Sequence, residues 1–196
     1  MHFSTLNIVL FDGFETLDAM GPAEVFGSLP SCRLRFISRE GGPVVSTQGV
    51  IVQTGIAAPG GEALLIPGGQ GTRTRVDDEE YLHWLYGLAN ASNVCMTVCT
   101  GSALLAKTGL LDGVRATTNK RAYGWVTSLR QQVRWQPRAR WVHDGKFWTS
   151  SGVSAGMDMA LGAVAENDGV AQAEALAGKM EYCWNRNPDE DPFARG

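Results

Sequence analysis

The stretch from Asn93 to Gly109 reads Asn-Val-Cys-Met-Thr-Val-Cys-Thr-Gly-Ser-Ala-Leu-Leu-Ala-Lys-Thr-Gly and decides the fold. Val94 to Val98 is a short apolar and β-branched run, as in a buried strand. Gly101 to Lys107 carries Ala and Leu at helical spacing, and Gly109 is a typical helix-ending residue. The stretch therefore predicts a strand, a sharp turn and a helix, with Cys99 at the turn.

The position of Cys99 favours a chemical role for its thiol. A sharp strand-to-helix turn lifts one side chain above the end of a sheet. The same turn places the thiol beside the free N–H groups and the positive dipole end of the helix, and both favour the thiolate. The alternative is a buried structural cysteine, which is how we interpret Cys95 inside the strand.

The chain on both sides of this stretch alternates strands with helices. Leu6 to Phe11 is an apolar strand closed by Asp12-Gly13, and it is followed by a helical pattern from Leu17 to Phe26. Asp18 falls near the start of that helix, where a capping carboxylate is the ordinary alternative, and Pro22 is allowed only in a first turn or at a kink.

The same patterns predict further elements along the chain. Two hairpins are expected, one around residues 47–49 and one around Asp144-Gly145. The other expected strands cover 33–38, 63–66 and 114–118, and the other expected helices follow the acidic run at 77–80 or cover 122–129, 152–166 and 170–182.

This order of elements predicts a three-layer α/β/α sandwich with a mostly parallel sheet and a small β-hairpin insertion, built as one domain over residues 1–196. Ligands of such sheets bind beyond the carboxyl ends of the strands. Asp18, Gly68-Gly69 and Cys99 should converge there.

Composition limits the possible partners. The 196 residues carry a net charge of −3, which gives no reason to expect a nucleic acid or an anionic membrane surface as partner. No apolar run reaches the ~20 residues of a spanning helix, and the N-terminus lacks a signal-peptide pattern, so we expect a cytoplasmic protein. The four cysteines and three histidines show no metal-ligand spacing, and we expect neither a metal nor a cofactor.

Four segments together resemble the ThiJ/PfpI superfamily, which has a flavodoxin-like fold related to class I glutamine amidotransferases. They are Phe11-Asp12-Gly13-Phe14-Glu15-Thr16-Leu17-Asp18, Ile66-Pro67-Gly68-Gly69, Val98-Cys99-Thr100-Gly101-Ser102 and Thr149-Ser150-Ser151-Gly152-Val153-Ser154-Ala155-Gly156-Met157-Asp158. Within the superfamily the chain looks most like isonitrile hydratases, on Asp18, Cys-Thr-Gly at the turn, Arg115-Ala116-Thr117-Thr118 and Glu181-Tyr182. AraC-type regulators share these segments but continue into a DNA-binding region, which we do not expect here.

Two departures from the superfamily pattern bear on the chemistry. Protease-like and glyoxalase-like members place His directly after the nucleophile, whereas this chain has Thr100, so a Cys–His dyad of neighbours is missing and peptidase activity is disfavoured. The hydratases tend to carry His where Asn119 stands. His143 is a possible remote partner, with a surface position as its alternative.

The resemblance implies a specific reaction on a small-molecule substrate. The Cys99 thiolate would attack the terminal carbon of an isonitrile while protonated Asp18 delivers a proton, and water would release an N-substituted formamide from the resulting thioimidate. The N–H groups of Thr100 and Gly69 are expected to bind the anion formed in the second step. Phe14, Gly68, Asn119 and Trp125 are the expected pocket residues, with core packing as the alternative for the aromatics. The resemblance also implies a homodimer.

Two other functions use the same residues. One is a glyoxalase or deglycase, in which the thiolate adds to a small dicarbonyl. The other is a non-enzymatic redox sensor or ligand-binding protein, in which an accessible, low-pKa Cys99 is oxidised beside Asp18.

Overall fold

The fold was determined as a computed structural model that describes residues 4–57 and 61–194. The strands in these residues are β1 (Thr5–Val9), β2 (Arg33–Ser38), β3 (Gly42–Val45), β4 (Ile51–Ile56), β5 (Gly61–Ile66), β6 (Ser92–Thr97), β7 (Arg115–Ala116), β8 (Arg134–Trp135), β9 (Trp141–Asp144) and β10 (Phe147–Ser150). The helices are α1 (Thr16–Gly27), α2 (Thr72–Arg75), α3 (Glu79–Ala91), α4 (Gly101–Lys107), α5 (Tyr123–Leu129), α6 (Ala155–Asp168) and α7 (Val170–Lys179).

The main sheet has the strand order β3-β4-β2-β1-β5-β6-β10-β9. Neighbours from β4 to β10 pair in parallel, and the antiparallel pairs are the two edge hairpins, β3–β4 and β9–β10. From β1 the chain first moves to β2 on one side and then to β5 on the other. The carboxyl ends of β1 and β5 therefore flank the point where the strand order reverses, which is where such sheets bind ligands.

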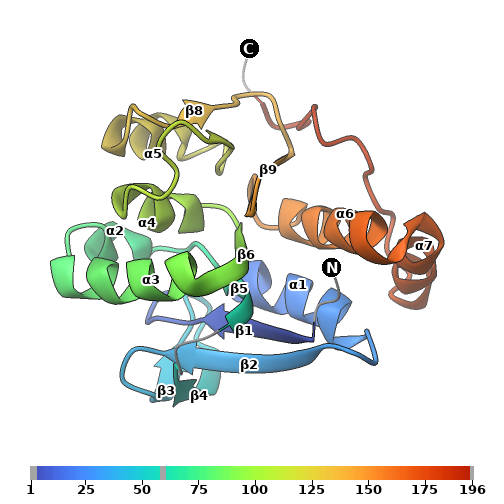
Figure 1. The fold of residues 1–196 in the computed structure, drawn as a ribbon, viewed down its shortest axis with the longest axis horizontal. Helices are drawn as coiled ribbons and strands as arrows, with labels where there is room; N and C mark the ends of the chain where they lie inside the picture. The colour runs from blue at the N-terminus through green and yellow to red at the C-terminus, as the bar shows by residue number, and fades with distance from the viewer. Residues whose placement is uncertain (1–3, 58–60, 195–196) are drawn as a thin grey trace.

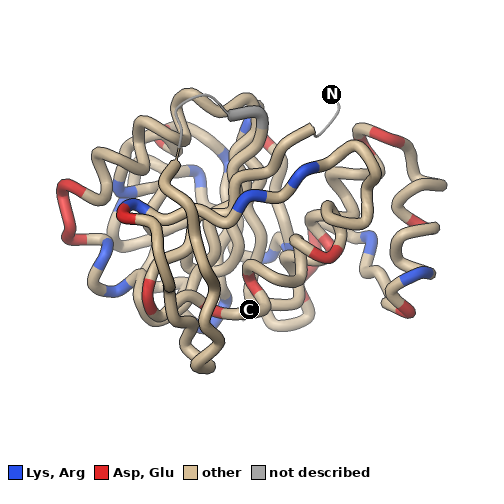
Figure 2. The backbone as a smooth tube through the Cα atoms, turned by 90° about the horizontal axis from the view of Figure 1, so that it is seen from below, with Lys and Arg blue, Asp and Glu red and all other residues tan. Residues whose placement is uncertain are grey.

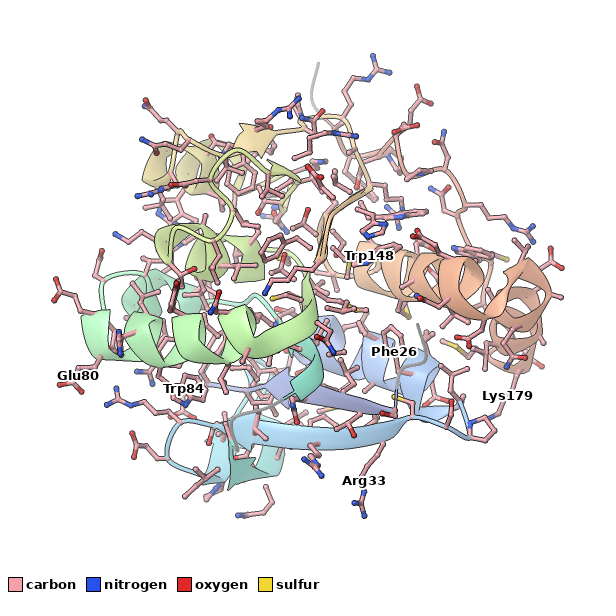
Figure 3. The ribbon with its side chains drawn as sticks, in the orientation of Figure 1. Phe26, Arg33, Glu80, Trp84, Trp148 and Lys179 are labelled. Atoms are coloured by element: carbon pink, nitrogen blue, oxygen red, sulfur yellow. The ribbon has the colours of Figure 1, made fainter. Side chains whose placement is uncertain are left out.

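Helices cover both faces of the sheet (Figure 1). α3 and α4 pack over β5 and β6 on one face, whereas α1, α6 and α7 cover the other face. The side chains between the layers are apolar and fully buried, and Figure 3 shows Phe26 and Trp148 directed inward while Arg33, Glu80 and Lys179 point outward. The expected three-layer, flavodoxin-like α/β fold is confirmed.

Most expected elements lie where the sequence places them, and both hairpins form. α3 begins after Asp78, whose Oδ1 accepts the N–H of Tyr81 at 3.0 Å. Pro22 lies inside α1, six residues after its start, and not in the first turn. The single turn of α2 and the two-residue strand β8 were not expected, because both are too short to show a periodic pattern.

The N-terminal segment read as lacking a signal peptide lies partly outside the described residues. After α7 the chain returns to β9, where the N–H of Arg140 donates to the carbonyl of Pro188 at 2.7 Å. No described helix has the length and apolar character needed to cross a bilayer. Basic and acidic residues are interspersed along the backbone (Figure 2).

Candidate active site

Cys99 occupies the turn between β6 and α4 in a left-handed conformation, with φ of 57°. Its N–H donates to the carbonyls of Ser151 (3.0 Å) and Ser150 (3.3 Å). Its carbonyl accepts hydrogen bonds from the hydroxyls of Ser102 and Thr118, both at 3.0 Å. Such a φ is uncommon for a residue with a side chain, and these bonds from three other segments stabilise it. The predicted strand–turn–helix with Cys99 at the turn is confirmed.

Two glycines allow the loops to meet under this turn. A side chain at Gly101 would place its Cβ 2.2 Å from the carbonyl oxygen of Ile66. A Cβ at Gly68 would lie 2.6 Å from the nitrogen of Thr100 and 2.9 Å from Oδ2 of Asp18. The backbone after β5 can therefore touch both the turn and the start of α1 only because these positions lack side chains.

Asp18 is fully buried in the first turn of α1. Its Oδ2 accepts the N–H of Gly68 at 2.9 Å, while no described nitrogen or oxygen donates to Oδ1. The pKa of Asp18 is raised to about 7, chiefly by burial and to a smaller extent by the charge of Glu15. Hydrogen bonds from Gly68 and from the Cys99 thiol act in the opposite direction.

The sulfur of Cys99 lies among hydrogen-bond donors, although only 6% of the residue is exposed. Nδ2 of Asn119 donates to Sγ at 3.0 Å, and the N–H groups of Thr100 and Val153 also donate to it. Burial nevertheless raises the pKa of the thiol well above its ordinary value, and the neighbouring carboxyl of Asp18 adds to this.

This corrects the expectation of a low-pKa thiolate. The seven-residue helix α4 does point its N-terminus at Cys99, but desolvation of the sulfur outweighs that effect. Because Asp18 and Cys99 both resist ionisation and repel each other as anions, the pair holds at least one proton at neutral pH. The two side chains are in direct contact, so this proton can pass between them.

The amide of Asn119 has a fixed orientation. Its Oδ1 accepts the N–H groups of Arg121 (2.9 Å) and Ala122 (3.0 Å), so the NH₂ group is the one that faces the sulfur of Cys99. From the sequence Asn119 was expected only to line the pocket. Its contact with the sulfur depends on the path of the chain between β7 and α5, which no local pattern reveals.

A cavity of about 410 Å³ opens above the thiol, and we call it the Cys99 cavity. Its lining is mostly polar and consists of Glu15, Gly69, Gln70, Arg73, Cys99, Thr100, Asn119, Arg121, Ala122 and Val153. Glu15, Arg73, Arg121 and Val153 were not expected there. The N–H of Val153 reaches the sulfur from a backbone with φ of 39°, a conformation that no sequence pattern indicates for valine.

Three expected lining residues lie elsewhere. Phe14 is fully buried in the core, and Gly68 is buried against Asp18. Trp125 is half-buried beneath the guanidinium of Arg73, 3.6 Å from the centre of its ring. Phe14 therefore packs in the core and Trp125 packs against it, which was the alternative to a place in the pocket.

His143 does not contact this site. Its ring stacks on Trp148 at 3.9 Å, and its two nitrogens bond to Glu166 (3.1 Å) and to the carbonyl of Gly145 (2.9 Å). It belongs to the surface of β9, so the idea of a remote catalytic partner is wrong.

The expected pair of anion-binding N–H groups is also corrected. The N–H of Gly69 donates to Oγ1 of Thr100 at 3.1 Å, so it is already occupied. The hydroxyl of Thr72 lies 3.1 Å from the same oxygen. Thr100 therefore fixes the loop after β5 through its hydroxyl, while its own N–H points at the sulfur of Cys99.

Within residues 4–57 and 61–194, no group of three or more His, Cys, Asp or Glu side chains is arranged to hold a metal ion.

Comparison with known proteins identifies relatives with this arrangement of segments. Residues 5–166 match the model of the DJ-1/PfpI family. An isonitrile hydratase of Pseudomonas putida is 31% identical over 180 residues, which cover 90% of this chain and 78% of that protein. The HTH-type transcriptional regulator GbdR of Pseudomonas aeruginosa is 29% identical over 133 residues, which cover 68% of this chain but 36% of the regulator.

Solved structures of related proteins have the same fold as this chain. A ThiJ/PfpI family protein from Pseudomonas syringae superposes with a TM-score of 0.80 at 28% identity, over 98% of this chain and 78% of that one. Drosophila melanogaster DJ-1beta superposes with a TM-score of 0.77 at 16% identity, over 93% of this chain and all of that one, and shares the fold. The chain belongs to the DJ-1/PfpI family.

Proposed function

We propose that this chain is a cysteine-dependent lyase of the isonitrile hydratase type, which adds water to an isonitrile to give an N-substituted formamide. The observation that carries the proposal is the buried contact between Asp18 and Cys99, with Cys99 lining an open cavity. The 31% identity to an isonitrile hydratase over 90% of the chain supports it.

The first step uses both members of the pair. The terminal carbon of an isonitrile carries a lone pair that takes a proton, after which the carbon accepts a nucleophile. Asp18 passes the shared proton to this carbon while the sulfur of Cys99 forms the C–S bond. The product is a thioimidate, R–N=CH–S–Cys99, and Asp18 is left as a carboxylate.

The second step returns the pair to its starting state. Asp18 takes a proton from water as the oxygen of that water attacks the thioimidate carbon, and the nitrogen receives this proton. The C–S bond then breaks as the C=O bond forms, and the hydroxyl proton goes back to the pair. The donors Asn119, Thr100 and Val153 stabilise the departing thiolate.

Burial of the thiol also bears on the other functions. A redox sensor needs a thiol that is both exposed and easily ionised, whereas Cys99 is 6% exposed and its pKa is raised. The glyoxalase or deglycase alternative places no such demand, and it is therefore compared directly in the experiment below.

The test incubates the purified chain with benzyl isonitrile and measures N-benzylformamide by chromatography and mass spectrometry. We expect turnover by the wild type and none by Cys99→Ala. Cys95→Ala is the matched control, because Cys95 is a fully buried cysteine on β6, the strand that leads to Cys99, and it does not line the cavity. Under single-turnover conditions, intact mass should show the isonitrile added to the wild type.

Other outcomes would identify the other functions. Lactate from methylglyoxal without any formamide would replace the hydratase proposal with a glyoxalase. A mass increase after mild peroxide that is lost in Cys99→Ala, with no turnover of either substrate, would indicate a sensor. Full formamide production by Cys99→Ala would exclude the mechanism.

The homodimer and the cytoplasmic location stay predictions. Light scattering on the purified chain measures the first, and fractionation of the native cells measures the second.

A further inference from the structure

Two arginines line the Cys99 cavity, and the mechanism above uses neither of them. Arg73 comes from α2, and Arg121 comes from the loop before α5. Both side chains are exposed at the cavity. The third formally charged lining residue is Glu15, whose Oε1 accepts a hydrogen bond from Nε2 of Gln48 at 2.8 Å.

Neither arginine forms an ion pair with a carboxylate of the described residues. Six of the ten other arginines in the described residues do, including Arg39, Arg130 and Arg140. Two cations therefore line the cavity without an ion-pair partner among the described residues.

Each of the two arginines has one contact beside the cavity. The guanidinium carbon of Arg73 lies over the ring of Trp125, 3.6 Å from its centre, in a cation–π contact that uses none of the guanidinium N–H groups. The backbone N–H of Arg121 donates to the same Asn119 side chain that contacts the sulfur. The position of Arg121 is thus tied to the position of the reacting atom.

We propose that the Cys99 cavity takes small isonitriles that carry a carboxylate, with Arg73 and Arg121 binding the carboxylate while the isonitrile carbon meets Cys99. This inference rests on the proposed hydratase function and names the class of its substrate. The planar N–H fork of arginine matches a carboxylate, and the mostly polar lining of a 410 Å³ cavity suits a short anionic substrate better than a bulky apolar one.

The experiment compares isocyanoacetate with its methyl ester, which has nearly the same shape and no charge. The ratio of kcat/KM for the acid to kcat/KM for the ester is measured in the wild type, in Arg73→Gln, in Arg121→Gln and in the double variant. Each substitution should lower this ratio about tenfold, the size of one charge-assisted hydrogen bond to a carboxylate. Arg33→Gln is the control, because Arg33 is exposed on β2 and points away from the molecule (Figure 3).

A binding measurement keeps the two proposals separate. N-formylglycinate, the product expected from isocyanoacetate, and its methyl ester are titrated into the same proteins by calorimetry. Binding of the anion by the wild type, weaker binding of the ester and loss of anion binding in the double variant support the subsite even if no isonitrile is hydrated. If the anion binds in this way but no isonitrile is hydrated, the hydratase proposal fails and the carboxylate subsite stands.

Two results would overturn the subsite. One is equal turnover of acid and ester that the double variant does not change, with no preference for the anionic product. The other is that neither isonitrile is hydrated and N-formylglycinate does not bind, which would overturn both proposals.

Discussion

Two fully buried aspartates, Asp18 and Asp158, have opposite environments. Each lies in the first turn of a helix, α1 for Asp18 and α6 for Asp158. Asp158 accepts hydrogen bonds from Nε of Arg140 at 2.7 Å and from the hydroxyl of Tyr182 at 3.0 Å. Asp18 has the N–H of Gly68 and the thiol of Cys99 as partners, and no cation of residues 4–57 and 61–194 pairs with it.

Burial raises the pKa of both carboxyls. At Asp158 the hydrogen bond and the positive charge of Arg140 act in the opposite direction and lower the pKa. A buried carboxylate with a cation and several donors is suited to remain ionised and hold elements together. Here it connects α6 to β9 and to the C-terminal segment through Arg140 and Asn185. A buried carboxyl without a cation is suited to exchange a proton near neutral pH. The same residue type in the first turn of a helix is therefore suited to a structural role in one place and, under the proposed function, to proton transfer in the other.

Because Asp18 lacks the cation that Asp158 has, the largest expected effect is a loss of turnover in the variant Asp18→Asn. The amide keeps the shape and can still accept from Gly68, but it cannot move a proton. We expect kcat/KM for benzyl isonitrile to fall about 10³- to 10⁴-fold, the contribution of a positioned acid–base group. Circular dichroism should show an unchanged fold. Activity within tenfold of the wild type would remove Asp18 from the mechanism.

The same variant should be more stable than the wild type at alkaline pH. The pKa of Asp18 is about 7 in the folded chain and 3.8 for the free side chain, so the folded state binds the proton more tightly. The unfolding free energy of the wild type therefore decreases from about pH 4 to pH 7, and Asp18→Asn lacks this loss. Urea unfolding should show a difference near zero at pH 4 that grows to about 4 kcal/mol above pH 7. A pH-independent difference would show that Asp18 ionises normally.

At the second aspartate the expected effect is on stability. Arg140→Met leaves the buried carboxylates of Asp158 and Asp191 without their cation, and the unfolding free energy at pH 7 should fall by about 3 kcal/mol. Arg138→Met is the matched control, since its ion pair with Glu190 is exposed and should change stability by less than about 0.5 kcal/mol. Equal values for the two variants in urea unfolding would contradict the contrast.

The smallest effect concerns the donor to the sulfur. Asn119→Ala removes one hydrogen bond to Cys99 and should lower kcat/KM about tenfold, most clearly in the release of the formamide. Asn187→Ala is a fair control, because its side chain also accepts a backbone N–H, from Asp189 at 3.1 Å, but it lies in the C-terminal segment. Equal rates for the two variants would leave Asn119 with a role in loop geometry alone.

The sequence was sufficient for the fold because the signals of the fold are local. Apolar runs, helical spacing and glycines predicted β1, β5, β6 and α4, and with them the loops that carry Asp18, Gly68 and Cys99. Parallel strands end at one edge of a sheet, so their order alone brings these loops together. Very short elements such as α2 and β8 have no period to detect, and they were missed.

The electrostatic state of the site was decided only by the tertiary structure. The sequence placed Cys99 at a helix N-terminus and predicted a thiolate, whereas the packing around the sulfur removes water and raises its pKa. Residues far along the chain, Asn119 and Val153, complete the donors to that sulfur, and Arg73 and Arg121 give the cavity its charge. Desolvation and charge depend on every atom within a few ångströms, and those neighbours come from segments that no local pattern connects.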